Sequence, residues 1–225
     1  NARFSGIGAT GEIIAFEDDF QTDSGWTVSG GAGDGQWGRG VPIDCGRGDP
    51  PSDADGSGIC FLTDNSSASN CNSDVDDGQT ILTSPTLDAS APGSVISYSR
   101  WFNNVAGASP NQDTMLVQVS GDGGLSWVGL EVVGPVAEAD GGWYQKEFLV
   151  GTYVQNSSNF RIRFIAQDTG DGSVVEAAVD GVRLLATECI DDGPSCPGDV
   201  DGNGSVEFAD LVSLLSAWGS SCTGC

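Results

Sequence analysis

The chain has 225 residues, of which 32 are acidic and only 8 are basic, so its formal net charge is −24. A charge of this size and sign argues against nucleic acid and anionic membrane surfaces as partners, because both would repel the protein. The chain contains no histidine, which removes the usual general base, the histidine-dependent hydrolase triads and most catalytic zinc sites. Its apolar runs fall well short of a membrane span, so we expect no membrane insertion.

Seven cysteines in an acidic chain fit an oxidising compartment, which predicts a secreted or cell-surface protein. The chain starts at Asn1, and we interpret this start as that of a processed protein whose export signal has been removed. An odd number of cysteines leaves one without a partner in the chain. The pairs that we expect are Cys60 with Cys71, and Cys189 and Cys196 with Cys222 and Cys225, which leaves Cys45 over. The sequence does not fix this pairing.

Residues 1–15 form an N-terminal extension that mixes glycines with apolar side chains. The stretch is too apolar for a plain linker and too rich in glycine for a helix. Its end favours the first strand of a domain, whereas the residues before it need another host. We interpret the extension as a candidate donor strand that adds to a sheet edge of a second copy. The side chains that would fill pockets in the neighbour are Phe4, Ile7, Ile13 and Ile14.

The next region reads as short strands separated by clusters of turn residues. Ser94–Phe102, Met115–Val119 and Phe160–Ala166 alternate apolar with polar side chains, and the last run directs Arg161 and Arg163 outwards. No convincing helix appears before the C-terminal end. The spacing of these runs predicts a mainly β protein, an antiparallel β-sandwich.

Short motifs in this region occur in an order that resembles MAM-type jelly rolls. They are Phe16-Glu-Asp-Asp-Phe20 with Trp26, Trp37-Gly-Arg-Gly40, Asp55-Gly-Ser-Gly58 before Cys60-Phe-Leu-Thr-Asp64, Leu82-Thr-Ser-Pro85, Ile96-Ser-Tyr-Ser-Arg-Trp101 and Glu176-Ala-Ala-Val-Asp-Gly-Val182. The resemblance covers residues 16–189. It implies a two-sheet jelly roll of adhesion or binding type, commonly appended to extracellular proteins and often calcium-bound.

Two groups of acidic residues in this domain are candidate calcium sites. In jelly rolls of this resemblance the starts of the first and last core strands meet at a calcium ion. The ligands that this implies are Glu17, Asp18 and Asp180, with Asp64 as a fourth. The second group consists of Asp49, Asp53 and Asp55 with Asp74, Asp76 and Asp77. For this second group, a solvated acidic loop that binds nothing is an equally good interpretation.

Residues 199–210 follow the ligand order of an EF-hand calcium loop, with oxygen-bearing side chains at loop positions 1, 3, 5, 9 and 12. These side chains belong to Asp199, Asp201, Asn203, Glu207 and Asp210. Gly204 allows the sharp turn at position 6, and Ser205 offers its backbone carbonyl at position 7. The all-oxygen ligand set predicts Ca²⁺ as the cofactor.

A short helix is predicted directly after this loop. Leu211, Leu214, Leu215 and Trp218 form one apolar stripe, and Gly219 ends it. A loop that enters a helix without a preceding helix, between Cys196 and the Cys222–Cys225 pair, resembles the Cys-bounded dockerin-type modules of secreted planctomycete-type bacterial proteins. The resemblance covers residues 196–225, behind a short connector over residues 190–195. Dockerins carry two such repeats and this chain has one, which weakens the case for docking to a cohesin.

Taken together, these patterns predict a non-catalytic, secreted, calcium-binding structural protein. We expect its copies to assemble head to tail into an extracellular fibre or surface polymer, through the N-terminal strand and the C-terminal module. One alternative is a carbohydrate- or glycoprotein-binding adhesion module, for which Trp143 is the tryptophan best suited to contact a glycan. A further alternative is docking to a cohesin-like scaffold. Glycoside hydrolysis by a carboxylate pair is the remaining enzyme reading, and it is weak because many of the 32 acidic residues would form a suitable pair.

Overall fold

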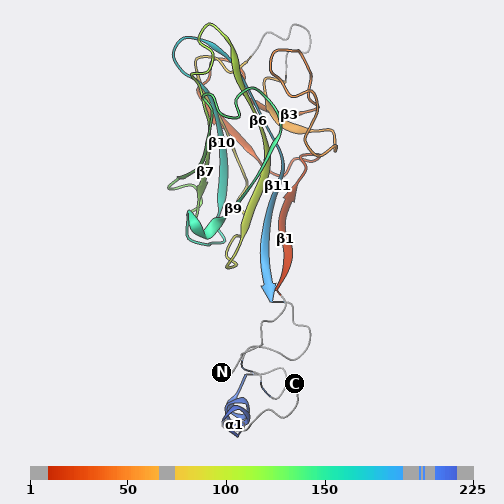
Figure 1. Cartoon of the computed structure of the whole chain (residues 1–225), viewed down its shortest axis with the longest axis vertical. Helices are drawn as coiled ribbons and strands as arrows, with labels where there is room; N and C mark the ends of the chain where they lie inside the picture. Colours follow the sequence, from red (N-terminus) through yellow and green to blue (C-terminus); the bar gives the residue numbers. More distant parts are fainter. Residues whose placement is uncertain (1–9, 66–73, 190–197, 199, 201–205, 217–225) are drawn as a thin grey trace. The chain divides into compact units, whose positions relative to one another are not determined.

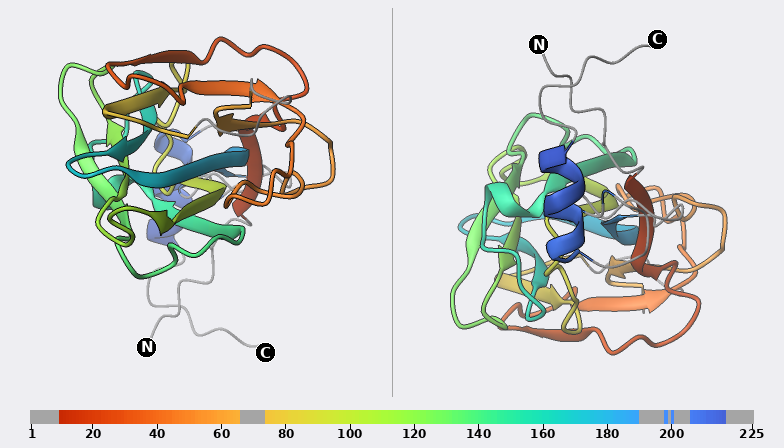
Figure 2. Two further views of the ribbon diagram at one scale, coloured as in Figure 1. Left: turned by 90° about the horizontal axis from the view of Figure 1, so that it is seen from above. Right: turned by 90° about the horizontal axis from the view of Figure 1, so that it is seen from below.

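A computed structural model describes residues 10–65, 74–189, 198, 200 and 206–216 of the chain. The chain divides into two compact units. The larger unit spans Ile14–Ala186, and the smaller combines Asn1–Ile13 with Thr187–Cys225. The larger unit holds two antiparallel sheets, which confirms the predicted β-sandwich (Figures 1 and 2).

The six-stranded sheet has the strand order β3-β4-β11-β6-β9, and β1 pairs with β11 off this path. Its strands are β1 (Thr10–Asp18), β3 (Trp37–Gly40), β4 (Cys60–Thr63), β6 (Val95–Gly107), β9 (Tyr144–Leu149) and β11 (Ser173–Cys189). The five-stranded sheet has the order β2-β5-β10-β7-β8. Its strands are β2 (Thr27–Gly30), β5 (Gly78–Thr83), β7 (Met115–Ser120), β8 (Val128–Val133) and β10 (Arg161–Asp168). A 3₁₀ turn, η1 (Val150–Thr152), follows β9.

The alternation that predicted the strands also builds the core between the two sheets. In β10, Ile162, Phe164 and Ala166 are buried, whereas Arg161 and Arg163 alternate with them and are more exposed. Phe164 packs edge-on against Tyr98 of β6, with ring centroids 5.0 Å apart. Side chains that point inwards from both sheets therefore interdigitate, as the period-2 pattern requires.

A buried charge network belongs to the same sandwich. The side chain of Arg100 in β6 is only 1% exposed, and its Nη2 donates to Glu131 Oε1 of β8 at 2.6 Å and to Glu138. Lys146 of β9 also donates to Glu138, at 2.8 Å. These contacts cross from one sheet to the other and pair the buried guanidinium with carboxylates, as burial of a charge requires.

A long connection, residues 41–59, joins β3 to β4 and lies against the six-stranded sheet; we call it the 41–59 loop. The carbonyl of Gly48 accepts a hydrogen bond from the Trp101 indole at 2.7 Å. Gly48 has φ +115°, and a Cβ there would lie 2.7 Å from Cγ of Asn103, so this close approach to β6 requires glycine. The carbonyl of Ser52 accepts a second bond, from the Trp143 indole at 2.9 Å.

The predicted pairing of Cys60 with Cys71 is wrong. Cys60 is a free, buried cysteine in β4, packed with Leu62 and Ala178 in a small apolar cluster that Trp101 and Trp143 adjoin. This enclosure raises the pKa of the Cys60 thiol.

Cys45, predicted to be left over, is disulfide-bonded instead. Its partner is not among the cysteines whose side chains are described. The other predicted disulfide cysteines, Cys189, Cys196, Cys222 and Cys225, have side chains outside the described part of the chain.

The smaller unit contains the helix α1 (Phe208–Ser216), which begins three residues before the predicted apolar stripe. Leu211, Leu214 and Leu215 are each at least two-fifths exposed, and Trp218 lies outside the described residues. In the parts of the chain that are described, α1 is the one α-helix, and no helix there is long and apolar enough to cross a membrane.

Candidate calcium site

Asp180 anchors the 41–59 loop to the six-stranded sheet. It lies in β11 where the pairing register with β6 shifts, between Asp180 and Arg183, and its side chain is fully buried. Its Oδ2 accepts hydrogen bonds from the backbone N–H groups of Ala54, at 2.7 Å, and Asp55, at 3.3 Å. Its Oδ1 accepts a bond from the N–H of Gly181 at 2.8 Å. The irregular strand therefore directs one carboxylate at the turn of the loop.

Asp53 and Asp55 complete a group of three carboxylates with Asp180. One ligand oxygen from each residue lies within 4.8 Å of the other two. The loop turn itself is built by side-chain acceptors, because Asp53 Oδ2 accepts from Gly58 N–H at 2.8 Å and Asp55 Oδ1 accepts from Ser57 N–H at 2.8 Å. Three carboxylates this close repel one another unless a cation or protons intervene. Carboxylate oxygens are the ligands that calcium prefers.

The electrostatics of the group differ from one member to the next. Burial, reinforced by the charge of Asp55, raises the pKa of Asp180 to about 6 even though three backbone N–H groups stabilise its ionised form. Burial also acts to raise the pKa of Asp53, but hydrogen bonds, chiefly from Gly58 N–H, outweigh it and lower that pKa. The group thus combines a carboxylate whose pKa is lowered, Asp53, with one whose ionisation is displaced to about pH 6, Asp180.

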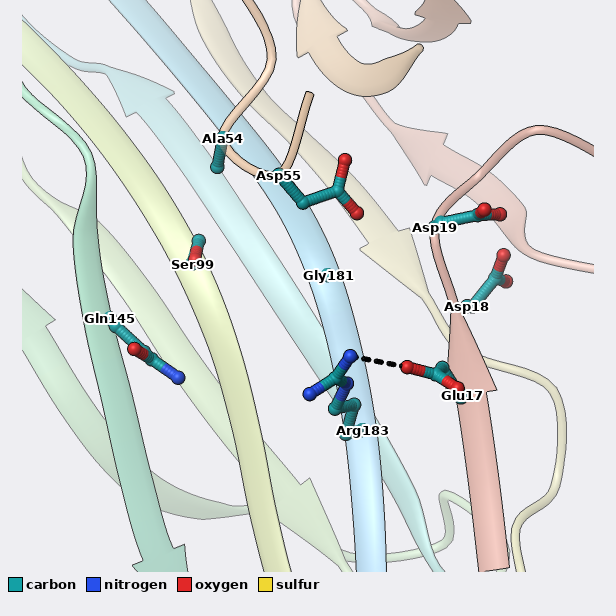
Figure 3. A pocket seen from close by; sticks show the side chains of 9 residues that line it. All are labelled: Glu17, Asp18, Asp19, Ala54, Asp55, Ser99, Gln145, Gly181 and Arg183. Atoms are coloured by element: carbon teal, nitrogen blue, oxygen red, sulfur yellow. Dashed lines mark ion pairs between the residues drawn. The ribbon is translucent and has the colours of Figure 1, made fainter. Parts of the chain in front are cut away.

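A pocket of about 210 Å³ lies next to these carboxylates (Figure 3). Its lining comes from three segments: Glu17 and Asp18 at the end of β1 with Asp19 directly after them, Asp55 of the 41–59 loop, and Arg183 of β11. Arg183 Nη2 pairs with Glu17 Oε1 at 2.5 Å, and both side chains are roughly half exposed. An exposed pair of this kind contributes about 0–1 kcal/mol.

Among the described residues, the predicted ligand group of Glu17, Asp18, Asp64 and Asp180 does not form a close group of carboxylates, although Glu17 and Asp18 line the pocket beside Asp55. Both carboxylate oxygens of Asp18 already accept hydrogen bonds, from Phe20 N–H at 2.9 Å and from the Trp26 indole at 2.8 Å. Asp64 lines a different pocket, together with Asp34 and Arg39. Asp18 therefore serves the corner between β1 and β2, and Asp64 does not join Asp180.

The second predicted group is also divided. Asp53 and Asp55 leave it to join Asp180, which the sequence had assigned to the first group. Asp74 instead pairs with Arg47 at 3.1 Å. Asp76 forms an isolated bridge with Asp34, while Asp49 and Asp77 are not in the three-carboxylate group. The closely spaced Asp53 and Asp55 could have been recognised in the sequence as two ligands of one site. Their third partner, Asp180, could not, because it lies 126 residues after Ala54.

Trp143, the predicted glycan contact, lies beside the 41–59 loop. It is half-buried, its ring meets that of Trp101 edge-on at 5.9 Å, and its indole N–H is held by Ser52. Trp26 and Trp37 are buried in the core. Trp127 is half-buried on the five-stranded sheet, with the Arg163 guanidinium 4.1 Å from its ring centroid.

The EF-hand-like loop of the smaller unit falls mostly outside the described residues: Asp199, Asp201, Asn203 and Ser205 are not described. Glu207 is described, and so is Asp210, which is 3% exposed. Asp210 Oδ1 accepts from Val200 N–H at 2.6 Å and Oδ2 accepts from Glu207 N–H at 2.7 Å. The carboxylate at loop position 12 thus closes the chain on itself at the start of α1.

Two of the predicted assembly residues, Phe4 and Ile7, also lie outside the described residues. Ile13 and Ile14 lie in β1, with 38% and 57% of their surface exposed. Because β1 begins at Thr10 and pairs with β11 of the same chain, residues 10–15 of the predicted donor strand have a partner within the chain. The prediction that they add to a second copy finds no support here.

No protein-family model matches the chain, and the comparison with curated proteins finds no relative. Among solved structures, the K1 cleaved adhesin domain of Lys-gingipain from Porphyromonas gingivalis W83 has a TM-score of 0.50 at 16% identity, covering 76% of this chain and 97% of that one. The family 11 carbohydrate-binding module of Clostridium thermocellum, in complex with a β-1,3-1,4-mixed-linked tetrasaccharide, has a TM-score of 0.43 at 14% identity, covering 79% of this chain and 97% of that one. The likeness to the adhesin domain shows the fold: the larger unit is a β-sandwich of that type.

Proposed function

We propose that the chain is a non-catalytic, extracellular adhesion module that binds glycans or glycoproteins beside a loop held in place by calcium. The observation that carries this proposal is the convergence of Asp53, Asp55 and Asp180, which joins the 41–59 loop to the sheet. A cation there would neutralise the group and fix the loop. The same loop holds the Trp143 indole through Ser52, so the state of the ion is coupled to the position of this ring.

A glycan suits this surface better than a charged macromolecule. A half-buried tryptophan offers an apolar ring with polar neighbours, which is the usual composition of a small-molecule binding site. The net charge of −24 repels acidic partners but not neutral sugars. The absence of histidine supports a binding role rather than acid–base catalysis.

The proposal is tested by glycan-array binding with the chain in calcium and after chelation. We expect binding to fall at least about tenfold, or ~1.4 kcal/mol, on chelation and with Trp143→Ala. Trp127→Ala is the matched control, because it removes a half-buried tryptophan from the five-stranded sheet. Binding that disappears with Trp127→Ala and persists with Trp143→Ala would place the glycan on the wrong sheet for this proposal. Absence of binding to every glycan and glycoprotein would refute the function itself.

For the smaller unit we propose a calcium-binding, dockerin-type loop and helix over residues 196–225. The buried Asp210 carboxylate and its two backbone bonds support this assignment, because they close the loop at its last ligand position. Docking to a cohesin-like scaffold and head-to-tail assembly into a fibre stay predictions. Sedimentation of the full chain in calcium tests the fibre reading, since a sharp monomer boundary would contradict it.

A further inference from the structure

Three buried polar side chains lie together at another place in the sandwich. Asp168 is the last residue of β10 and is 3% exposed. Asp113 stands two residues before β7 and is 1% exposed, and Asn104 of β6 is fully buried. The strands concerned, β6, β7 and β10, are labelled in Figure 1. Neither the 41–59 loop nor the Asp53–Asp55–Asp180 group contributes a residue to this set.

Hydrogen bonds connect Asp113 to Asn104 and to Thr169, the residue that follows Asp168. Asp113 Oδ1 accepts from the N–H of Thr169, the neighbour of Asp168, at 2.9 Å. Asn104 Nδ2 donates to the backbone carbonyl of Asp113 at 2.8 Å. The second oxygen of Asp168, Oδ2, accepts a long bond of 3.4 Å from Ser173 N–H. Asp113 is therefore tied on one side to Asn104 and on the other to the end of β10.

One oxygen of each residue is left over. Asp113 Oδ2, Asp168 Oδ1 and Asn104 Oδ1 are all buried, and no donor from the described residues reaches any of them. Neither carboxylate takes part in an ion pair with a described cation. Buried acceptors without a donor and buried charges without a partner are both costly, so native proteins rarely leave three of them in one place.

The two carboxylates also oppose one another electrically. Burial, with the Asp113 charge as the next cause, raises the pKa of Asp168 to about 6. Asp76 and Asp74, which lie earlier in the chain, add to this effect. Two buried carboxylates that act on one another in this way repel unless a cation or a shared proton intervenes.

We propose that Asp113, Asp168 and Asn104 bind a divalent cation of the calcium type, which joins the end of β10 and the start of β7 to β6. The three leftover oxygens are hard ligands, and the set contains neither sulfur nor imidazole nitrogen, which disfavours zinc and copper. Two carboxylates balance the double charge of the ion, so the site with its ion is neutral. A neutral site can be buried at far lower cost than two unpaired carboxylates. Calcium accepts carboxylate and amide oxygens in irregular arrangements and completes its shell with water, whereas magnesium demands a near-ideal octahedron.

The test is the number of calcium ions held by the full chain, counted by native mass spectrometry. Asp168→Asn keeps the shape of the side chain and removes one charge, and we expect it to hold one ion fewer than the wild-type chain. Asp171→Asn is the matched control, because it removes the same charge from an exposed residue three positions along the chain. Asp113→Asn should lose the same ion as Asp168→Asn, which provides a second variant if one of them folds poorly.

Thermal unfolding separates a cation from the two other ways of satisfying the site, a proton shared by the carboxylates and a buried water. With a cation, Asp168→Asn lowers Tm in calcium but not in chelator, where the loss of like-charge repulsion raises it. An unchanged ion count, or a Tm that rises equally in both conditions, would overturn the proposal. Asp55→Asn removes a ligand of the other site, so the double variant with Asp168→Asn should lose two ions.

Discussion

At the scale of single residues, several acids of this sandwich are buried rather than solvated. Glu176 of β11 is the extreme case: it is 1% exposed, its Oε2 accepts from the Thr63 hydroxyl at 3.1 Å, and its Oε1 has no donor among the described residues. Burial, followed by the charge of Asp49, raises its pKa to about 9. Glu176 is therefore a neutral acid at pH 7, and it belongs to the packing of the sheet rather than to a charged site.

This assignment predicts how stability depends on pH. The unfolded Glu176 releases its proton near its ordinary value of 4.5, whereas the folded side chain keeps its proton up to about pH 9. The folded state then binds more protons over this window, so the free energy of unfolding falls as the pH rises through it. The Gln side chain of Glu176→Gln cannot titrate. We therefore expect the free energy of unfolding of this variant at pH 8, measured in urea melts, to exceed that of wild type by ~2 kcal/mol.

The gap between the two proteins should close below pH 4.5, where both the folded and the unfolded wild-type side chains are protonated. Thr63→Val, which removes the hydroxyl donor but no titrating group, serves as the control for disturbed packing. A Glu176→Gln chain that is less stable than wild type at pH 8 would mean that Glu176 is ionised and partnered in the folded protein.

At the scale of elements, the strands could be predicted and the loop could not. The alternation in Phe160–Ala166 predicted β10, because side chains in a strand point to opposite faces whatever the rest of the chain does. The 41–59 loop has no periodicity, and its contacts are made with Trp101, Trp143 and Asp180, far along the sequence. Asp53 and Asp180 were consequently placed in different predicted sites.

Cysteine pairing failed for the same physical reason. Spacing along the chain says nothing about which face of a strand a cysteine occupies, and Cys60 packs in an apolar cluster beside Trp101 and Trp143. By contrast, the EF-hand-like pattern is local, so the sequence alone defines it. The alternation of the strands was therefore readable from the sequence and the EF-hand-like loop stays a prediction, whereas arrangements that depend on one loop crossing a sheet were not readable.

The loop offers a prediction at this scale. Asp55→Asn keeps the acceptor for Ser57 N–H but weakens the proposed ion site, and we expect calcium affinity there to fall at least about tenfold, or ~1.4 kcal/mol. The loop should then open more often and release the Trp143 indole N–H from Ser52. Hydrogen exchange of that indole, followed by NMR, should accelerate in the variant.

Asp19→Asn is the matched control, because Asp19 is exposed in the same pocket but is not in the three-carboxylate group. Its Trp143 indole should exchange at the wild-type rate. Equal exchange rates in wild type and Asp55→Asn, in calcium, would show that the carboxylate group does not hold the loop.

At the scale of the whole molecule, the net charge of −24 makes the folded chain sensitive to ions in two different ways. Sodium chloride at 0.1 M largely screens interactions between exposed charges that lie farther apart than the Debye length of about 10 Å, but it screens buried groups far less. A bound calcium ion acts on buried groups directly. At a hundred times its dissociation constant, one ion stabilises the folded state by about 2.7 kcal/mol, so two ions in the sandwich would supply ~5 kcal/mol. Typical domains are stable by about 5–15 kcal/mol in total, which makes this a large share.

We therefore expect chelation to lower Tm substantially and added calcium to restore it. Magnesium chloride at the same ionic strength should restore Tm only in part. The comparison at matched ionic strength is decisive, because screening depends on ionic strength whereas coordination depends on the ion.

The dependence of stability on pH provides a second test of bound calcium. In chelator, the buried Asp180 and Asp168, whose pKa values are raised to about 6, make stability fall as the pH rises from about 4 to 6, since the folded state holds protons that the unfolded state has released. In calcium that fall should disappear, because ligand carboxylates are ionised in the folded state. A chain whose melting curves in chelator, magnesium and calcium coincide at every pH would have a sandwich held together without metal.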